Sequence, residues 1–453
     1  MKDVNYGRQT ALALENFNIT DKRVNRRLIG AMLQIKEAAA AAHKELGLME
    51  PALADAIVAA CRLAEQGEVD DLFVTTAWQG GAGTSTNMNV NEVIASLAEK
   101  VAGNGLKVDP LDDVNRGQST NDVYPTALRI AAIGLVRELA DACSRLQEAL
   151  QQKENEYETV VKLGRTELMD ALPMTLGQEF GAYAQAIARD RWRIYKVEER
   201  LRQINLGGTA MGTGSAADRQ YGFLVIEKLR RMTEMGLARA EYPIDLTQNN
   251  DVFVEVSGLL KALAVNLMKI ATDLRLMNSG PGGGLGEIRL KALQAGSTIM
   301  PGKVNPVIPE MVTQVAIKVM AGDSAIATAA ACGNFELNAF LPLIADTLLE
   351  NLELLSKTVD IFRTKCIEVL EANPAACRRH LENSMALAAT LMPLLGYAVT
   401  AEVIETAQGD PRQVPAIILE QGLMDEEDLR RVMDSHFGAT YLKKEEKISG
   451  ERI

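Results

Sequence analysis

The chain has 453 residues, a net charge of -12, 47% hydrophobic residues and only 4% aromatic residues. These proportions are typical of a globular protein with enough residues for two or three domains, and they exclude intrinsic disorder. An acidic chain with few aromatic rings also lacks the basic, stacking surface of a nucleic-acid-binding protein, so we expect no nucleic-acid partner.

Histidine and cysteine are too sparse for the common metal and nucleophile sites. His43, His380 and His436 are far apart in the sequence, which argues against a multi-histidine metal site or a histidine triad. The five cysteines form no C-x-x-C pair, and we interpret them as small buried residues in a reducing cytosol. The first ten residues have no apolar stretch, so we expect no signal peptide and a cytoplasmic location.

Apolar periodicity predicts a mainly all-α chain. Helices are expected over 27–46 and 51–65, and from Pro125 onward leucines recur at spacings of seven and four, which form one face of a long helix. The other long helices are expected over 174–204, 251–277, 306–330 and 340–370. Several of these helices are apolar most of the way round, so they must be covered on several sides, and we expect copies of the chain to associate.

The last part of the chain is expected to fold separately, after a boundary at Asn373-Pro374. The uncharged stretch 383–401 has roughly the length of a membrane span, but it contains Pro393 and Gly396. We therefore expect a buried helix broken at the proline and no membrane contact. Short helices are expected over 414–420 and 426–434, and the charged end 443–453 is expected to be frayed.

Four polar, glycine-containing segments mark expected helix ends, at residues 80–91, 115–122, 164–170 and 295–306. The third of them is expected to begin the second long helix. Free N–H groups at helix N-termini bind carboxylates or phosphates well, and glycines permit a close approach. There is no Walker loop and no G-x-G-x-x-G fingerprint. The segments therefore indicate a small-anion site with few titratable groups.

The most specific segment is GSTIMPGKVNP at 296–306, which follows GAGTSTNMNVNEV (81–93), VNRGQSTNDVYPT (114–126), GRTELMDALPMTLGQEF (164–180) and SGPGGGLGEI (279–288). Together these motifs resemble the aspartase/fumarase superfamily over nearly the whole chain, and they are most similar to its ammonia-lyases. The resemblance implies three domains, at 1–117, 118–373 and 374–453, with a central bundle of long helices that builds a homotetramer. It also implies active sites shared between three subunits, and no organic cofactor.

The family's reaction is an elimination across a Cα–Cβ bond that releases fumarate. Removal of the Cβ proton creates an enediolate-like dianion, so catalysis depends on donors around the developing charge. The resemblance implies that Ser297 is the general base, activated by backbone N–H groups of its loop and by Lys303. It places Thr166 and Glu167 among the catalytic groups as well. The substrate-binding residues that it implies are Thr84, Asn87, Ser119, Thr120, Asn121, Thr298, Met300, Asn305 and Glu310.

Two details favour loss of ammonia from L-aspartate: Thr120 in QSTND, and the segment VNPVIPE at 304–310. Residues 109–112 also lack the histidine of the second anion site that is typical of fumarases. GNFELN at 333–338 instead resembles fumarase. Fumarate hydratase therefore stays an alternative, as do a lyase for an N-substituted aspartate and a scaffold without activity.

Glu167 departs from the family pattern, which has histidine or glutamine at this position. Its implied neighbour is Glu310, and two adjacent carboxylates repel each other. We hypothesise that the substrate's ammonium, held by Glu167 and Asn121, relieves the repulsion. This would favour an amine leaving group and would admit a modified aspartate. No metal site is predicted, and no residue pattern tells whether a divalent metal activates the protein.

Overall fold

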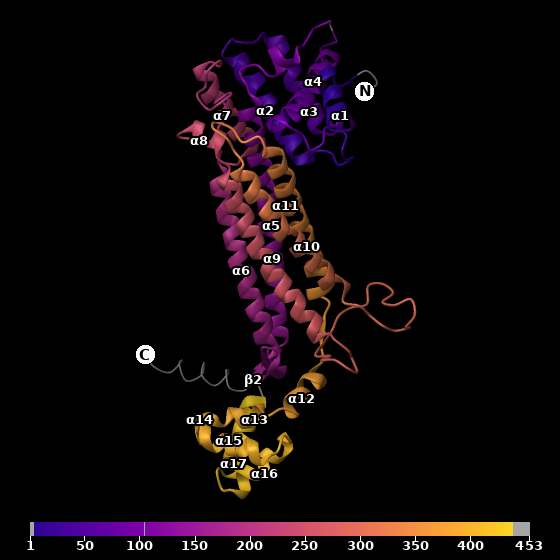
Figure 1. Ribbon diagram of the computed structural model, residues 1–453, viewed down its shortest axis with the longest axis vertical. Coiled ribbons are helices and arrows are strands. Elements are labelled where there is room, and N and C mark those ends of the chain that lie inside the picture. Colours follow the sequence, from indigo (N-terminus) through magenta and orange to yellow (C-terminus); the bar gives the residue numbers. More distant parts are fainter. Residues whose placement is uncertain (1–3, 104, 438–453) are drawn as a thin grey trace. The chain divides into compact units, whose positions relative to one another are not determined.

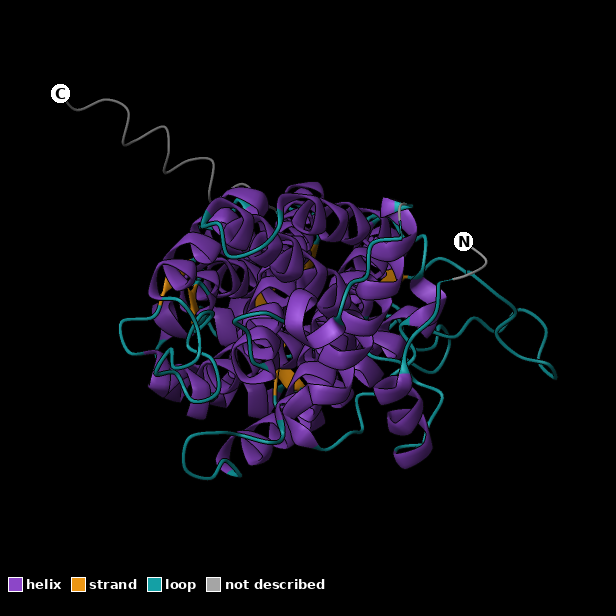
Figure 2. Cartoon of the chain, turned by 90° about the horizontal axis from the view of Figure 1, so that it is seen from above, coloured by secondary structure: helices purple, strands orange, loops and turns teal. Residues whose placement is uncertain are grey.

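The computed structural model describes residues 4–103 and 105–437. Helices make up most of these residues, and the strands are short (Figure 2). The α-helices, labelled in Figure 1, are α1 (Arg8–Asn16), α2 (Arg26–Glu45), α3 (Pro51–Glu65), α4 (Thr84–Ala102), α5 (Thr120–Glu156), α6 (Leu176–Leu201), α7 (Arg219–Thr233), α8 (Pro243–Gln248), α9 (Asp251–Met277), α10 (Val307–Ala331), α11 (Leu341–Phe362), α12 (Pro374–Glu382), α13 (Ala386–Thr390), α14 (Met392–Leu395), α15 (Tyr397–Thr406), α16 (Val414–Glu420) and α17 (Glu426–Phe437). The mainly helical fold is thus confirmed, whereas the predicted fraying of 443–453 lies outside the described residues.

Three two-stranded sheets accompany the helices. They pair β1 (Val161–Thr166) with β2 (Met169–Thr175), β3 (Gln203–Ile204) with β4 (Ala238–Arg239), and β5 (Ile288–Arg289) with β6 (Glu371–Ala372). The β3–β4 pair is parallel and the other two pairs are antiparallel.

The chain forms two compact units. The first contains Met1–Asp141, Asp190–Ala264 and Val315–Lys357, and the second contains Ala142–Arg189, Val265–Gln314 and Thr358–Ile453. Each of the five longest predicted helices contributes residues to both units. The division into three domains stays a prediction.

In the first unit, α2 packs against α3 and α7, and α4 packs against α3 and α1. The buried face of α2 includes Leu28, Met32 and Ile35, which are spaced four and three residues apart. Buried alanines follow them, and their small side chains let the neighbouring helices approach closely.

The N-terminus of α1 is capped by a side chain from α4, because its own N-cap residue is Gly7. The Glu92 carboxylate accepts hydrogen bonds from the backbone N–H groups of Gly7 (3.0 Å), Gln9 (2.8 Å) and Thr10 (3.0 Å), and from the Thr10 hydroxyl (2.6 Å). These N–H groups have no partner within their own helix, so the distant carboxylate both satisfies them and complements the helix dipole.

Polar contacts join the long helices within each unit. In the first unit, Arg137 of α5 donates two hydrogen bonds to Glu198 of α6, at 2.8 and 2.9 Å. In the second unit, the Tyr183 hydroxyl of α6 donates to Asp273 of α9 at 2.9 Å. The cores between these contacts are leucine-, isoleucine- and alanine-rich, as the periodicity predicts.

The predicted bounds of α9 agree with the structure, whereas α5 begins earlier than expected, at Thr120. Pro125 therefore lies inside the helix. Proline has no N–H group to donate to the carbonyl four residues before it, which is that of Asn121. The side-chain amide of Asn205 donates to that carbonyl instead, at 3.1 Å, so the helix tolerates the proline.

The prediction that 164–170 begins a long helix is wrong. These residues form the turn of the β1–β2 hairpin, and α6 begins only at Leu176. The two residues of the turn, Glu167 and Leu168, have φ values of 55° and 65°. Two successive positive φ values are the geometry of a type I′ turn, which matches the twist of the two strands but is unfavourable for residues with side chains.

The predicted helices over 174–204 and 340–370 are also too long. The first loses its ends to β2 and β3, and α11 ends at Phe362, where an irregular helical turn follows. The stretch 383–401 forms the short helices α13 and α14 and the start of α15, and Pro393 lies in the first turn of α14. Within the described residues, no helix is both long and apolar enough to cross a membrane.

We expect Glu92→Ala to lower the free energy of unfolding by about 2 kcal/mol, because four donors lose their common acceptor. Chemical denaturation of the two proteins measures the difference. The matched control is Glu99→Ala on the same helix, whose carboxylate accepts from the Val108 N–H and the Lys107 ammonium and caps no helix start of the described residues. An equal loss in both variants would contradict the capping role.

Candidate active site

Thr84, the first of the predicted site residues, begins α4. The N-cap residue Gly83 has φ 95°, and a Cβ atom there would lie 2.2 Å from the ring of Tyr124, so only glycine fits. The capping side chain is Gln79: its Oε1 accepts from the Thr86 N–H at 3.1 Å, and its Nε2 donates to the Thr86 hydroxyl at 2.8 Å. Gln79 therefore fixes the helix start that presents Thr84.

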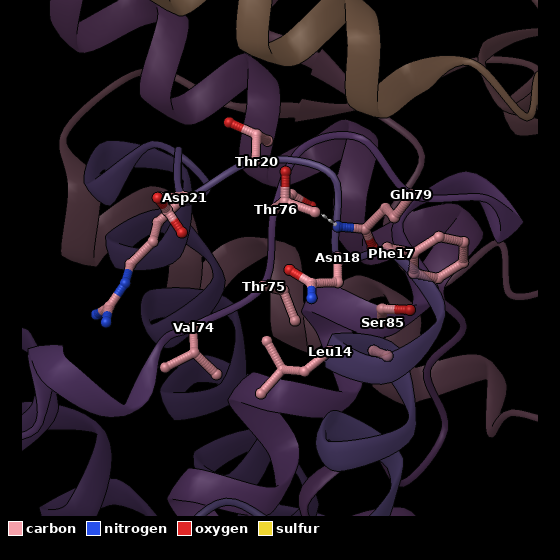
Figure 3. Close-up of a pocket in the computed structure, with 12 residues that line it drawn as sticks. Leu14, Phe17, Asn18, Thr20, Asp21, Val74, Thr75, Thr76, Gln79 and Ser85 are labelled. Atoms are coloured by element: carbon pink, nitrogen blue, oxygen red, sulfur yellow. Dashed lines mark hydrogen bonds between the residues drawn. The ribbon is translucent and has the colours of Figure 1, made fainter.

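Gln79 also lines a cavity of about 340 Å³, together with Phe17, Val74 and Ser85 (Figure 3). In Figure 3 its amide lies against Thr76, to whose carbonyl it donates a hydrogen bond. Ser85 lines this cavity, whereas Thr84 and Asn87 do not.

Ser119 and Asp122 form a capping box at the start of α5. The Ser119 hydroxyl accepts from the Asn121 N–H at 3.2 Å, and the Asp122 carboxylate accepts from the Ser119 N–H at 3.0 Å. The other Asp122 oxygen accepts from the N–H groups of Gly207 (3.1 Å) and Thr209 (2.9 Å). Burial raises the pKa of Asp122 to about 7, although these three N–H groups favour its ionised form.

Asn121 is held by the same 205–214 segment. Its Nδ2 donates to the Ala210 carbonyl at 2.7 Å, and its own carbonyl accepts from Asn205. Asn121 is therefore positioned by two contacts, and its Oδ1 is the side-chain atom that could accept from a substrate ammonium.

A buried polar network connects Asn87 and Thr120. Asn87 Nδ2 donates to the Thr120 hydroxyl and to Asn115 Oδ1, each at 3.1 Å. Lys36, which is completely buried in α2, donates to Asn115 Oδ1 at 2.9 Å and to Gln118 Oε1 at 3.0 Å. Burial lowers the pKa of Lys36 to about 7. Lys36 was not among the predicted site residues, and its signal in the sequence is only a lysine in the middle of an alanine-rich helix.

In the second unit, Thr166 ends β1 and Glu167 begins the turn, and both side chains are exposed. The fully buried carboxylate of Glu287 holds the strand through two ion pairs. Its oxygens lie 2.8 Å from Arg165 Nη1 and 3.2 Å from Lys162 Nζ. Arg165 and Glu287 belong to the motifs at 164–180 and 279–288, where neither was predicted to have a role, and Lys162 lies outside these motifs.

The loop 296–305 places Ser297 against its own backbone. Ser297 Oγ accepts hydrogen bonds from the N–H groups of Met300 (2.9 Å) and Ile299 (3.2 Å). The two ends of the loop meet, because Asn305 Nδ2 donates to the Gly296 carbonyl. A Cβ atom at Gly296 would lie 1.7 Å from the Lys303 carbonyl, so glycine is required there. The loop is thus a nearly closed ring, with the side chains of Thr298, Met300 and Lys303 exposed.

Glu310 lies in the first turn of α10, where Arg275 Nη2 is 3.9 Å from its carboxylate. Among the described residues, the structure records no contact between Glu310 and Glu167.

The predicted site residues therefore fall into two groups, one in each unit. Thr84, Asn87, Ser119, Thr120 and Asn121 belong to the first unit, at the starts of α4 and α5. Thr166, Glu167, Ser297, Thr298, Met300, Lys303, Asn305 and Glu310 belong to the second.

The loop before α5 also packs on a buried histidine. His43 stacks on Tyr221 with ring centroids 4.2 Å apart, and Gly117, with φ 66°, approaches both rings. Burial, together with the nearby charge of Arg116, lowers the pKa of His43 to about 4.

Because unfolded histidine has a pKa near 6.5, the unfolded chain binds a proton between about pH 6.5 and pH 4 that the folded chain does not. The free energy of unfolding should therefore fall as the pH drops through this window, with a contribution from His43 on the order of 2 kcal/mol. Chemical denaturation of the wild type and His43→Phe at several pH values measures it. The variant keeps the ring stack, and its stability should fall less steeply; parallel curves would contradict the assignment.

Proteins of known activity resemble this chain over most of its length. A family described as Lyase matches residues 1–321. An aspartate ammonia-lyase from a Bacillus species is 40% identical over 439 residues, which cover 96% of this chain and 94% of that protein. A class II fumarate hydratase from Corynebacterium glutamicum is 43% identical over 93% of this chain and 89% of that protein.

Solved structures are similar as well. A fumarate lyase:delta crystallin from Brucella melitensis, bound to cobalt, is 42% identical and has a TM-score of 0.90, with 95% of each chain covered. A class II fumarase from Schistosoma mansoni also has a TM-score of 0.90, at 32% identity.

Proposed function

The chain belongs to the aspartase/fumarase superfamily of lyases, and we propose that it is an aspartate ammonia-lyase, which converts L-aspartate into fumarate and ammonia. The observation that carries the proposal is the position of Ser297 Oγ, which accepts two backbone N–H groups of its own loop. Serine is a poor base, but donors aimed at its oxygen stabilise the alkoxide and so lower the cost of forming it.

In the proposed reaction, the Ser297 alkoxide takes a proton from Cβ, and the electron pair moves onto the neighbouring carboxylate. Thr84, Ser119 and Thr120 lie at helix N-termini, where hydroxyls and helix dipoles stabilise this negative charge. The pair then forms the Cα–Cβ double bond, and the C–N bond breaks, with its electrons leaving on ammonia. We assign the other carboxylate to Lys303 and Asn305.

Fumarate hydratase is the second candidate, since relatives of similar identity carry that name. The segment 109–113 argues against a second dicarboxylate site of the fumarase kind. Asp109 accepts from the N–H groups of Leu111 and Asp112, both at 2.8 Å, and Asp113 accepts from the Asp109 N–H. The segment thus presents carboxylates and no histidine, and would repel a second dicarboxylate. A lyase for an N-substituted aspartate is the third candidate, because of Glu167.

We further propose that the active enzyme is a homotetramer whose sites combine residues of three subunits. The β1–β2 hairpin supports this proposal, because Leu168 and Met169 beside Glu167 are 72% and 70% exposed in the single chain. Exposed large apolar side chains next to site residues are typical of a surface that another chain covers.

We expect the purified protein to release fumarate from aspartate and not from malate, as followed by the ultraviolet absorbance of fumarate.

Ser297→Ala should lower kcat by about a thousandfold, since it removes the base. Size-exclusion chromatography should show an unchanged oligomer. Release of fumarate from malate alone would overturn the ammonia-lyase assignment, and a rate within a few-fold of the wild type would overturn the role of Ser297.

Glu167→Gln should lower kcat/KM for aspartate by about tenfold or more, because the amide keeps the shape of the side chain but loses the charge that attracts an ammonium. The inhibition constant of succinate, which has no amino group, should change little. Leu168→Met on the same turn is the control, and it should leave both values within about twofold. An unchanged kcat/KM for aspartate would show that Glu167 does not bind the ammonium.

A further inference from the structure

We propose that Lys36 is a positioning residue that fixes the direction of the hydrogen bonds leading to Thr120, so that the Thr120 hydroxyl donates its proton to the substrate carboxylate. The inference rests on the proposed function, which assigns Thr120 to substrate binding. Lys36 lies on α2 and is completely buried, and its ammonium donates hydrogen bonds to Asn115 and Gln118 of the segment before α5.

The network has three steps. Lys36 Nζ donates to Asn115 Oδ1, Asn87 Nδ2 donates to that same oxygen, and Asn87 Nδ2 also donates to Thr120 Oγ1. Asn91 Nδ2 is a further donor to Asn115 Oδ1, at 3.3 Å. Two amide groups therefore separate the ammonium of Lys36 from the hydroxyl of Thr120.

When Lys36 is protonated, the direction of these bonds follows from the chemistry of its ammonium, which has three donors and no acceptor. It requires an oxygen from Asn115, so the amide nitrogen of Asn115 turns to the Gln118 carbonyl, at 3.3 Å. The Asn115 oxygen can only accept hydrogen bonds, so the Asn87 amide turns its nitrogen toward it. Because Asn87 donates to Thr120 Oγ1, the hydroxyl proton of Thr120 remains available for an acceptor in the active site.

The reverse network is available to the same side chains. Asn87 Oδ1 and Asn91 Oδ1 are buried and have no hydrogen-bond partner in the described chain. If the amides of Asn115, Asn87 and Asn91 rotated together, the Asn115 nitrogen could donate to the Asn87 and Asn91 oxygens, and the Thr120 hydroxyl could donate to Asn87 Oδ1. Thr120 would then turn its lone pairs toward the substrate carboxylate and repel it. The Lys36 ammonium prevents this state, because it would face the Asn115 amino group.

A conventional ion pair does not explain the burial of Lys36. Among the described residues, no carboxylate oxygen lies within salt-bridge distance of its ammonium. Asp122 contributes a longer-range attraction, and its oxygens are occupied by three backbone N–H groups. A buried charge with neutral partners is costly, so this lysine is better explained by what it orients than by a contribution to stability.

A double-mutant cycle between Lys36→Met and Thr120→Val tests the inference, with the affinity for succinate and kcat/KM for aspartate as readouts. Lys36→Met should weaken succinate binding by about tenfold, through a reversed Thr120 hydroxyl. The double variant should bind succinate as weakly as Thr120→Val alone, because Lys36 acts through Thr120. Lys153→Met removes another buried lysine, far along the chain at the Leu370 carbonyl, and should leave the succinate affinity unchanged.

Additive effects of the two substitutions, or unchanged binding in Lys36→Met, would overturn the inference. If Lys36→Met does not fold, two substitutions of Asn115 test the inference instead. Asn115→Asp keeps an acceptor and should bind succinate within about threefold of the wild type. Asn115→Leu has no acceptor and should lower the affinity for succinate by about tenfold. Equal effects of these two variants would overturn it. If the wild type binds succinate but releases no fumarate from aspartate, the proposed function fails and the cycle in succinate affinity still tests Lys36. A wild type that binds no succinate would overturn both.

Discussion

One buried carboxylate, that of Asp122, holds together the part of the fold on which the predicted anion site depends. It accepts hydrogen bonds from the N–H group of Ser119, just before α5, and from the N–H groups of Gly207 and Thr209 in the 205–214 segment. The same segment supplies Asn205 to the carbonyl that Pro125 leaves without a donor. Ser119, Thr120 and Asn121 therefore owe their positions to a segment more than 80 residues away in the chain. Asp122 therefore links the helix start to this segment, beside the contacts that Asn121 and Asn205 make between them.

The same solution recurs at other helix starts. Glu92 caps α1, and Gln79 caps α4, each from outside the helix it serves. Side chains from outside these helices satisfy part of the N-terminal backbone groups, while the side chain of Thr84 remains exposed. The result is an anion-binding surface made of hydroxyls, amides and helix ends, which suits a chain with only three histidines.

The helices could be predicted from the sequence because their apolar faces are long and regular, as α9 illustrates. The candidate site residues could be chosen because they belong to motifs with a recognisable order. The hairpin was missed, since its turn consists of Glu167 and Leu168, whose positive φ values no turn preference predicts. Lys36 was missed because a lysine in an alanine-rich helix ordinarily faces water. Long-range caps such as Glu92 are set by tertiary structure and leave no local signal.

Glu287 connects segments of the second unit that are far apart in the sequence. Its side chain holds β1 and hence Thr166, and its carbonyl accepts from the Asn373 N–H before α12. The chain then runs on from Glu287 toward the loop of Ser297. A change at Glu287 would therefore disturb the hairpin and the start of α12 together, so these two distant parts of the sequence are not free to vary independently.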